Sequence, residues 1–185
     1  MSANPQPSLL EELPGDLMMW VLIVSELLIF GAGLAAFLAV RLSDPAGFAE
    51  AQSHLHRTGA AFNTIVLITS GYLAAKALHW RTLAKRTAAR MALVAAAALG
   101  VVFLVIKGVE YADKAAQGIT YETHPFFMFY YLLTGFHAFH VVAGILVLLL
   151  VAWRDAPDNI EIGAAFWHMV DLVWVLLFPV VYLLA

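Results

Sequence analysis

An apolar stretch that carries two histidines sets the first limit on how this chain of 185 residues folds. Residues 126–151 contain no Asp, Glu, Lys or Arg, but they include His137 and His140. At about 1.5 Å of rise per residue, a helix over this stretch is roughly 39 Å long, which suffices to cross the roughly 30 Å hydrocarbon layer of a membrane. Ionisable groups at membrane depth are costly, so they normally face other protein and mark a functional site. The rest of the chain is therefore expected to supply partners for both histidines.

The composition is that of an integral membrane protein. Hydrophobic residues make up 63% of the chain and charged residues 12%, and the mean hydropathy is +0.85, which excludes an ordinary water-soluble domain. The absence of cysteine excludes disulfides, thiolate metal sites and iron–sulfur ligation within the chain. Residues 1–16 contain three prolines and three acids but no Lys or Arg. They lack the basic region of a cleavable signal peptide and are predicted to be a soluble tail.

Five apolar segments of helical length follow this tail. They cover residues 17–40, 60–78, 88–109, 126–151 and 162–184. Segments of about ten residues with alternating hydrophobicity, which are typical of a membrane β-barrel, do not occur in the sequence. The predicted fold is therefore all-α, a single membrane domain of five transmembrane helices over residues 17–185.

Charge in the connecting segments predicts the orientation. The loop over residues 79–90 holds the densest basic cluster of the chain, with Arg81, Lys85, Arg86 and Arg90. Loops rich in Lys and Arg tend to stay on the cytoplasmic side. With five spans, this places the N-terminus in the cytoplasm and the C-terminus outside.

Small residues recur at every fourth position in the first and third segments. The rows are Gly31, Ala35 and Ala39 in the first, and Ala88, Ala92, Ala96 and Gly100 in the third. Such rows let helices approach closely, so both are predicted to be helix contacts.

Ionisable groups from three segments are expected at overlapping depths. Helix rise from the inner boundary puts Glu26 about 13 Å deep, His140 roughly 18 Å and His137 roughly 22 Å. Asp171 lies at a depth similar to that of Glu26, with His168 one turn nearer the cytoplasm. An ionised carboxylate in hydrocarbon is disfavoured by at least about 2.5 to 3.5 kcal/mol, and a protonated one bonded to histidine avoids most of this. We therefore predict that Glu26 pairs with a histidine of the fourth segment.

Each of these groups has more than one interpretation. Glu26 is either a proton relay or one partner in an interhelical hydrogen bond. The two histidines are either haem or metal ligands, or part of a polar network or a lipid headgroup contact; the latter is favoured because no matched histidine pair lies opposite. Lys107 and Glu110 are three residues apart and are predicted to form an ion pair at the outer membrane boundary. No catalytic residue and no metal site are predicted.

Five motifs resemble, in chain order, those of subunit III of haem–copper terminal oxidases such as cytochrome c oxidase. They are VSELLIFGAG with Glu26, FNTIVLITSG with Asn63 and Ser70, KGVEY with Glu110, TGFHAFHVVAG with His137 and His140, and WHMVDLVW with His168 and Asp171. Each motif alone is weak. Five in register with the predicted spans are specific, and together they cover nearly all of residues 17–185.

The resemblance implies a subunit without haem or copper of its own, which packs against the catalytic haem–copper subunit I in a bacterial cytoplasmic membrane. It implies support of stability and proton uptake during aerobic electron transport, a bound phospholipid, and no nucleic-acid partner. By matching motif, Glu26 and His137 correspond to the intramembrane polar pair of the family. The remaining motif residues correspond to a polar framework, comprising His140, His168, Asp171, Glu110 and Asn63.

The chain departs from the common seven-helix form, because it begins at what resembles the third helix of the family. Five-helix versions occur in quinol oxidases and in proteins that accompany nitric oxide reductases, and the opening LPGDLMMWV looks closest to the latter. An accessory subunit of nitric oxide reductase is therefore one alternative. A small proton or solute transporter, built on the same intramembrane acid and histidines, is an alternative of another class. A haem b anchor on His137 and His140 is a third.

Overall fold

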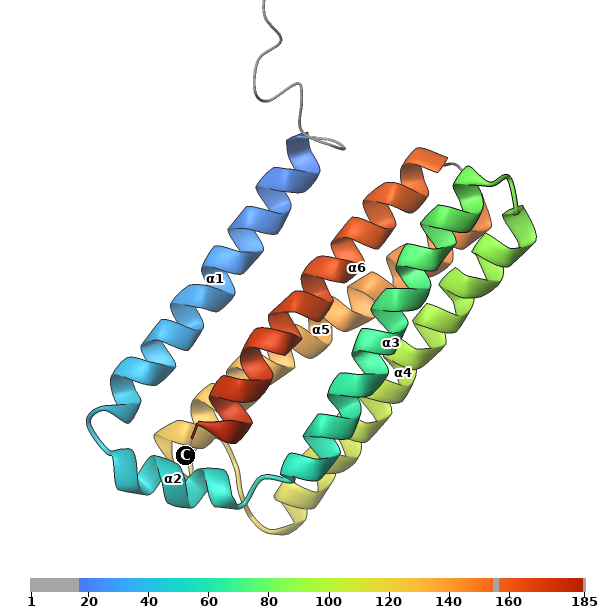
Figure 1. The fold of residues 1–185 in the computed structure, drawn as a ribbon. Coiled ribbons are helices and arrows are strands. Elements are labelled where there is room, and N and C mark those ends of the chain that lie inside the picture. Colours follow the sequence, from blue (N-terminus) through green and yellow to red (C-terminus); the bar gives the residue numbers. More distant parts are fainter. Residues whose placement is uncertain (1–16, 155–156, 185) are drawn as a thin grey trace, which may run out of the picture.

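The computed structural model describes residues 17–154 and 157–184, which form helices joined by short turns (Figure 1). The long helices are α1 (Leu17–Arg41), α3 (Arg57–Thr82), α4 (Arg86–Ala116), α5 (Pro125–Arg154) and α6 (Pro157–Phe178), with a short helix α2 (Pro45–Ser53) and a terminal π-helix η1 (Pro179–Leu183). Five helices are long and apolar enough to cross a membrane. Since the described residues contain no strand, the predicted all-α bundle of five transmembrane helices is confirmed.

Four of the long helices form the body of the bundle, and α1 stands at its side. Helix α3 packs on α4 and α6, and α5 packs on the same two helices, whereas α1 packs mainly on α5 and α6 (Figure 1). Only 11% of the most apolar window of α1 is buried, against 39–44% in the other spans. Helix α1 is therefore peripheral, and most of its surface is left for lipid or another chain.

Helix α2 closes one end of the bundle, which we call the α2 end; the opposite end, at the turn between α3 and α4, is the basic end. The buried side chain of Gln52 in α2 donates a hydrogen bond from Nε2 to the carbonyl of Val181 in η1, at 2.9 Å. The five predicted segments do not include α2, which lies between the first two of them. Asp44 followed by Pro45 is its start signal, because both residues are favoured where a helix begins.

Asp44 holds α2 in place through two partners. Its Oδ1 accepts a hydrogen bond from the backbone N–H of Gly47, at 3.0 Å, which caps the helix. Its Oδ2 lies 3.2 Å from Nε2 of His124, just before α5. The Gly47 N–H and the His124 imidazole both stabilise the ionised carboxylate, so they lower the pKa of Asp44 below its usual value.

A large indole sets the closest packing in the core. Trp167 of α6 is fully buried against two glycines, and a Cβ added at Gly144 of α5 or Gly100 of α4 would lie 2.5 Å or 2.7 Å from its ring. The row of small residues in the third segment is thus a helix contact, as predicted. The row in the first segment is not: Gly31, Ala35 and Ala39 are exposed, because α1 has only two neighbours and turns this face away from both.

Substitution of Gly144 by Ala is expected to destabilise the fold by about 1–3 kcal/mol, because the rigid Trp167 ring cannot move aside without disturbing α4 and α6. The matched control is Gly31→Ala, where the added Cβ has nothing within 4 Å. That change should alter stability by no more than about 1 kcal/mol, in the stabilising direction. Thermal unfolding of the purified protein in detergent measures both; equal loss in the two variants would contradict this packing.

The Asp44 contacts predict a pH-dependent protection of α2. Since the folded-state pKa of Asp44 is lowered, its contribution is present above the ordinary aspartate pKa of about 3.9 and is lost as the pH falls through the lower folded value. Hydrogen–deuterium exchange of residues 45–53 should be several times faster in Asp44→Ala than in the unmodified protein near neutral pH. The difference should vanish in acid; a difference that persists at every pH would contradict the role of the charge.

Candidate functional site: an acid–histidine pair and a buried lysine cluster

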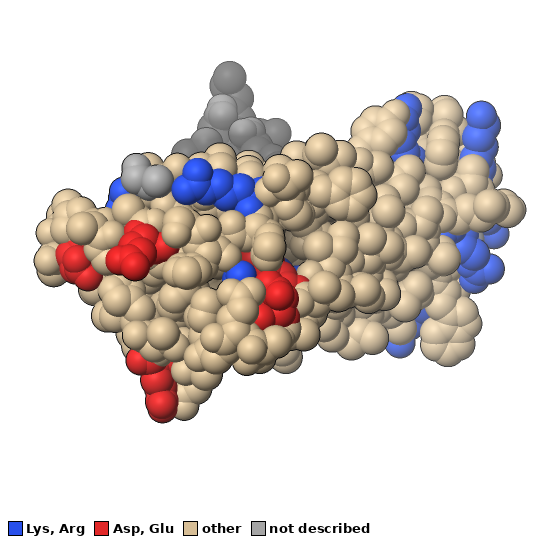
Figure 2. All heavy atoms as spheres, turned by 90° about the horizontal axis from the view of Figure 1, so that it is seen from below, with Lys and Arg blue, Asp and Glu red and all other residues tan. Residues whose placement is uncertain are grey.

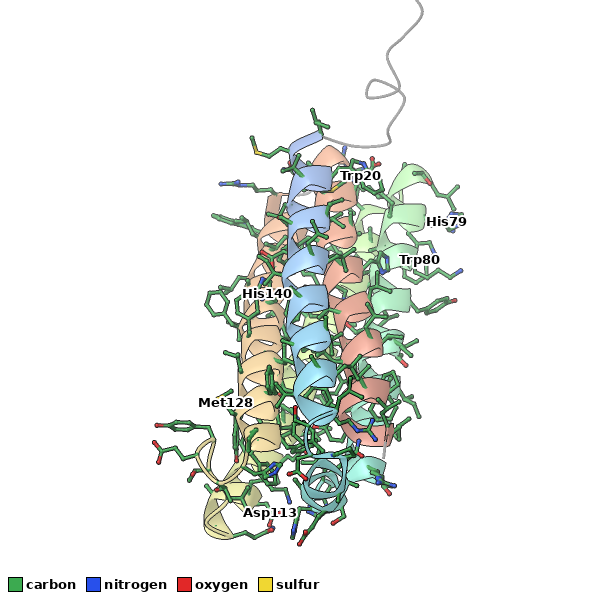
Figure 3. All side chains as sticks on the ribbon, turned by 90° about the vertical axis from the view of Figure 1, so that its left-hand side faces the viewer. Trp20, His79, Trp80, Asp113, Met128 and His140 are labelled. Atoms are coloured by element: carbon green, nitrogen blue, oxygen red, sulfur yellow. The ribbon has the colours of Figure 1, made fainter. Side chains whose placement is uncertain are left out.

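Glu26 of α1 and His140 of α5 meet in the seam between the two helices. Oε2 of Glu26 lies 3.1 Å from Nε2 of His140, and the two side chains are 20% and 11% exposed. Figure 3 shows His140 between Trp20, near the basic end, and Asp113, at the α2 end. The pair therefore lies far from both ends of the bundle, where the peripheral helix α1 packs on α5.

The backbone around His140 decides where its protons are. Nδ1 lies 2.9 Å from the carbonyl oxygen of Phe136, and a carbonyl can only accept, so Nδ1 carries a hydrogen. In a neutral imidazole, Nε2 is then an acceptor that faces Glu26 Oε2. The short contact is favourable when one proton is shared by the pair, either on the carboxyl or on Nε2. Oε2 makes no aligned hydrogen bond to the described residues, so its contact with Nε2 is close but angled.

The structure places His140, and not His137, beside Glu26. His137 is completely buried, and neither ring nitrogen has a hydrogen-bond partner in the described part of the chain. Its ring stacks on Trp174 at 5.2 Å and meets the edge of Phe103 at 5.5 Å. The prediction that Glu26 meets a histidine of the fourth span is correct, but the choice of His137 is wrong. Three residues along a helix turn the side chain by about 60°, which is enough to aim one histidine at α1 and the other at the core.

A second polar cluster surrounds Lys107 of α4, nearer the α2 end. Nζ of Lys107 donates to Glu110 Oε2 at 2.9 Å, to the Tyr130 hydroxyl at 3.2 Å and to the Tyr182 hydroxyl. The Tyr182 hydroxyl in turn donates to the Glu110 carboxylate at 3.0 Å and 3.1 Å. These bonds join α4 to α5 and to η1, so the cluster fastens the last residues of the chain to the bundle.

The predicted ion pair of Lys107 and Glu110 is present, and both of its side chains are largely buried, while its depth in the membrane stays a prediction. The side chain of Lys107 is 3% exposed and that of Glu110 is 10% exposed. Four aromatic rings lie around Nζ, with centroids 4.6–5.5 Å away, and they belong to Tyr111, Tyr130, Trp174 and Tyr182. The sequence shows the spacing of Lys107, Glu110 and Tyr111, but Tyr130 and Tyr182 lie 23 and 75 residues from Lys107. No local pattern brings them together.

The remaining motif residues lie in helix contacts. Asn63 of α3 is buried and donates from Nδ2 to the carbonyl of Phe103 in α4, at 3.2 Å. Asp171 of α6 is 8% exposed, and its Oδ2 presses against Gly71 of α3, where an added Cβ would lie 2.1 Å from it. Nδ1 of His168 lies 3.5 Å from the same point. Asn63 and Asp171 thus border helix interfaces, while the role of all three stays a prediction.

The two histidines of HAFH do not converge on one point, because His140 faces α1 and His137 faces Trp174 and Phe103. Over the described ranges, no group of three or more His, Asp, Glu or Cys side chains is arranged to hold a metal ion. The arrangement can instead hold protons at two sites, the Glu26–His140 pair and the Lys107 cluster.

Comparison with known proteins gives a consistent result over almost the whole chain. The family model described as cytochrome c oxidase subunit III matches residues 15–185. Cytochrome c oxidase subunit 3 of Synechocystis sp. is 33% identical over 175 residues, which cover 88% of this chain and 72% of the relative. The protein of the same name from Thermostichus vulcanus is 30% identical over 177 residues, covering 89% and 84%. That of Pyricularia grisea is 34% identical over 128 residues, covering 65% and 46%. These names give no support to the nitric oxide reductase or transporter alternatives.

A double-mutant cycle should show that Glu26 is coupled to His140 and not to His137. Glu26→Leu and His140→Leu each leave one polar partner in an apolar seam, whereas the double variant leaves none, so the two effects should be non-additive by about 0.5–3 kcal/mol. The matched cycle of Glu26→Leu with His137→Leu should be additive within about 0.5 kcal/mol. Thermal unfolding of the four variants measures both cycles, and stronger coupling to His137 would overturn the assignment.

Proposed function

The chain belongs to the cytochrome c oxidase subunit III family and is a non-catalytic subunit of an oxidase complex, and from this premise we propose what it contributes. It packs against the catalytic haem–copper subunit I, stabilises that subunit during turnover and supports its proton uptake. It brings no haem, copper or other redox cofactor of its own. Oxygen reduction and electron transfer belong to its partners.

The Glu26–His140 contact is the observation that carries this proposal. The pair lies between α5 and the peripheral helix α1, whose outer face is apolar and exposed at Val21, Leu28 and Ile29. A partner that covers this helix removes the last exposed part of the pair from lipid. Binding and protonation of the pair are then linked, which is how a subunit without a cofactor can act on the proton chemistry of its neighbour.

The distribution of charge supports an N-terminus in the cytoplasm of a bacterium, with the basic end inside. Figure 2 shows Lys and Arg side chains but no Asp or Glu at the right, where Figure 1 has the turn between α3 and α4, and side chains of both signs on the remainder of this face. Since positively charged loops stay inside, the α2 end faces the outer aqueous phase. The membrane is the bacterial cytoplasmic membrane.

A bound phospholipid is part of the proposal, with its acyl chain along α1. An apolar cavity of about 260 Å³ lies between α1 and α5, and its lining includes Ile29, Gly33 and Phe136. A second, of about 320 Å³, lies nearer the basic end and includes Met19, Val147 and Phe166. Both lie within membrane-spanning helices, where hydrocarbon is the natural occupant of an apolar groove.

The proposal predicts that Glu26→Ala in the assembled complex shortens the active lifetime during turnover severalfold, or weakens retention of this subunit, while the haem content stays unchanged. Activity over successive turnovers, subunit composition and haem absorption are measured on the same preparation. Glu50→Ala, at an exposed acid of α2, is the matched control and should behave as the unmodified complex. Loss of haem in Glu26→Ala would contradict a non-catalytic role for this chain.

A further inference from the structure

The Lys107 cluster contains more than a structural clamp requires. One ion pair between Lys107 and Glu110, bonded to the Tyr182 hydroxyl, already joins α4 to η1 and is neutral as a whole. The structure adds a second hydroxyl, that of Tyr130, and faces of four aromatic rings around the ammonium. Ring faces stabilise a cation when it is removed from water. The surroundings therefore suit a cluster that carries a net positive charge part of the time.

A cavity at the α2 end borders this cluster. This cavity, of about 280 Å³, is bounded by Glu110 and by the apolar side chains of Ile106 and Val109. Two further lining residues, His56 and Asp113, form an exposed ion pair at 3.0 Å. Glu110 is consequently the one member of the cluster that meets both this cavity and the buried ammonium.

Direct hydrogen bonds run inward from Glu110 and then stop. They pass from the Glu110 carboxylate to the hydroxyl of Tyr182 and to Nζ of Lys107, and from there to the hydroxyl of Tyr130. The side chain of His137, two helical turns further along α5, makes no hydrogen bond to any described residue. A proton that binds at Glu110 thus has no direct hydrogen-bonded path through the described residues to the Glu26–His140 pair.

We propose that Lys107, Glu110, Tyr130 and Tyr182 form a proton-storing site that exchanges one proton with the aqueous phase at the α2 end, through the cavity beside His56 and Asp113. In the empty state Lys107 is an ammonium and Glu110 a carboxylate. On uptake, a proton from water adds to the Glu110 carboxylate, and the four rings stabilise the ammonium that has lost its counter-charge. On release, the same proton returns to the cavity.

The charged and titratable groups around the site are contributed by several elements. Together they are Tyr111, Asp113 and Lys114 from α4, Tyr131 and His137 from α5, and His56 from the start of α3. His56 and Asp113 line the cavity, and both side chains are exposed. Their signals have to be separated from that of the buried carboxyl.

Infrared difference spectra of the complete complex in lipid nanodiscs, recorded in steps between about pH 4 and 9, test the proposal because this range covers ordinary carboxyl and histidine titrations. The unmodified complex should show a protonated-carboxyl band that grows as the pH falls and that disappears in Glu110→Gln. Asp113→Asn, a matched loss of a carboxylate three residues further on, should keep that band.

A variant that preserves the packing gives the second readout. Tyr182→Phe retains the ring but removes the hydroxyl that donates to the ionised carboxylate, so the half-titration point of the band should move to higher pH by about one unit. Co-purification of the variant chain with the other subunits shows that it still assembles. A static clamp would keep Glu110 ionised throughout, and spectra of Glu110→Gln that overlay those of the unmodified complex at every pH would overturn the proposal.

Discussion

The interior of a membrane offers polar groups no water, and this constraint explains most of the arrangement of the bundle. A buried donor or acceptor without a partner costs several kcal/mol, which favours packing that pairs such groups within the protein. Lys107 meets this demand by collecting bonds from three helical elements, and Asn63 by reaching the backbone of its neighbour. The polar residues that appear out of place in apolar helices are thus the ones that fix which helices lie together.

Helix α1 differs from the other spans, because its polar group lies on a helix that is mostly exposed. It has few buried side chains, yet it carries an ionisable group far from either end. The partner it finds, His140, has its tautomer set by its own helix through the Phe136 carbonyl. A peripheral acid that depends on one imidazole responds to whatever covers the helix, which a core residue cannot do. This suits a subunit whose role lies in its contact with another.

The fold was predictable because long apolar segments have few alternatives in a membrane, and five of them gave five helices. The site was predictable only in part. Counting rise along each helix gave the height of Glu26 and of the histidines, but not the direction in which each points. The direction of a side chain depends on where the neighbouring helices lie. Because α1 is peripheral, the histidine that faces it is His140 and not His137. The contacts of Tyr130 and Tyr182 with Lys107 were not predictable for a related reason, because they join residues far apart in the chain.

His137 shows how two protonatable sites can coexist in one bundle without becoming a conduit. It lies between them along α5, but it packs as an aromatic ring against Trp174 and Phe103 and has no direct hydrogen bond within the described residues. A proton path needs an unbroken series of donors and acceptors, and a stacked imidazole interrupts it. A subunit inside an energy-conserving membrane has to keep protons from crossing it. The packed imidazole of His137 meets this need, because it fills the core between the Lys107 cluster and the Glu26–His140 pair without hydrogen-bonding to either.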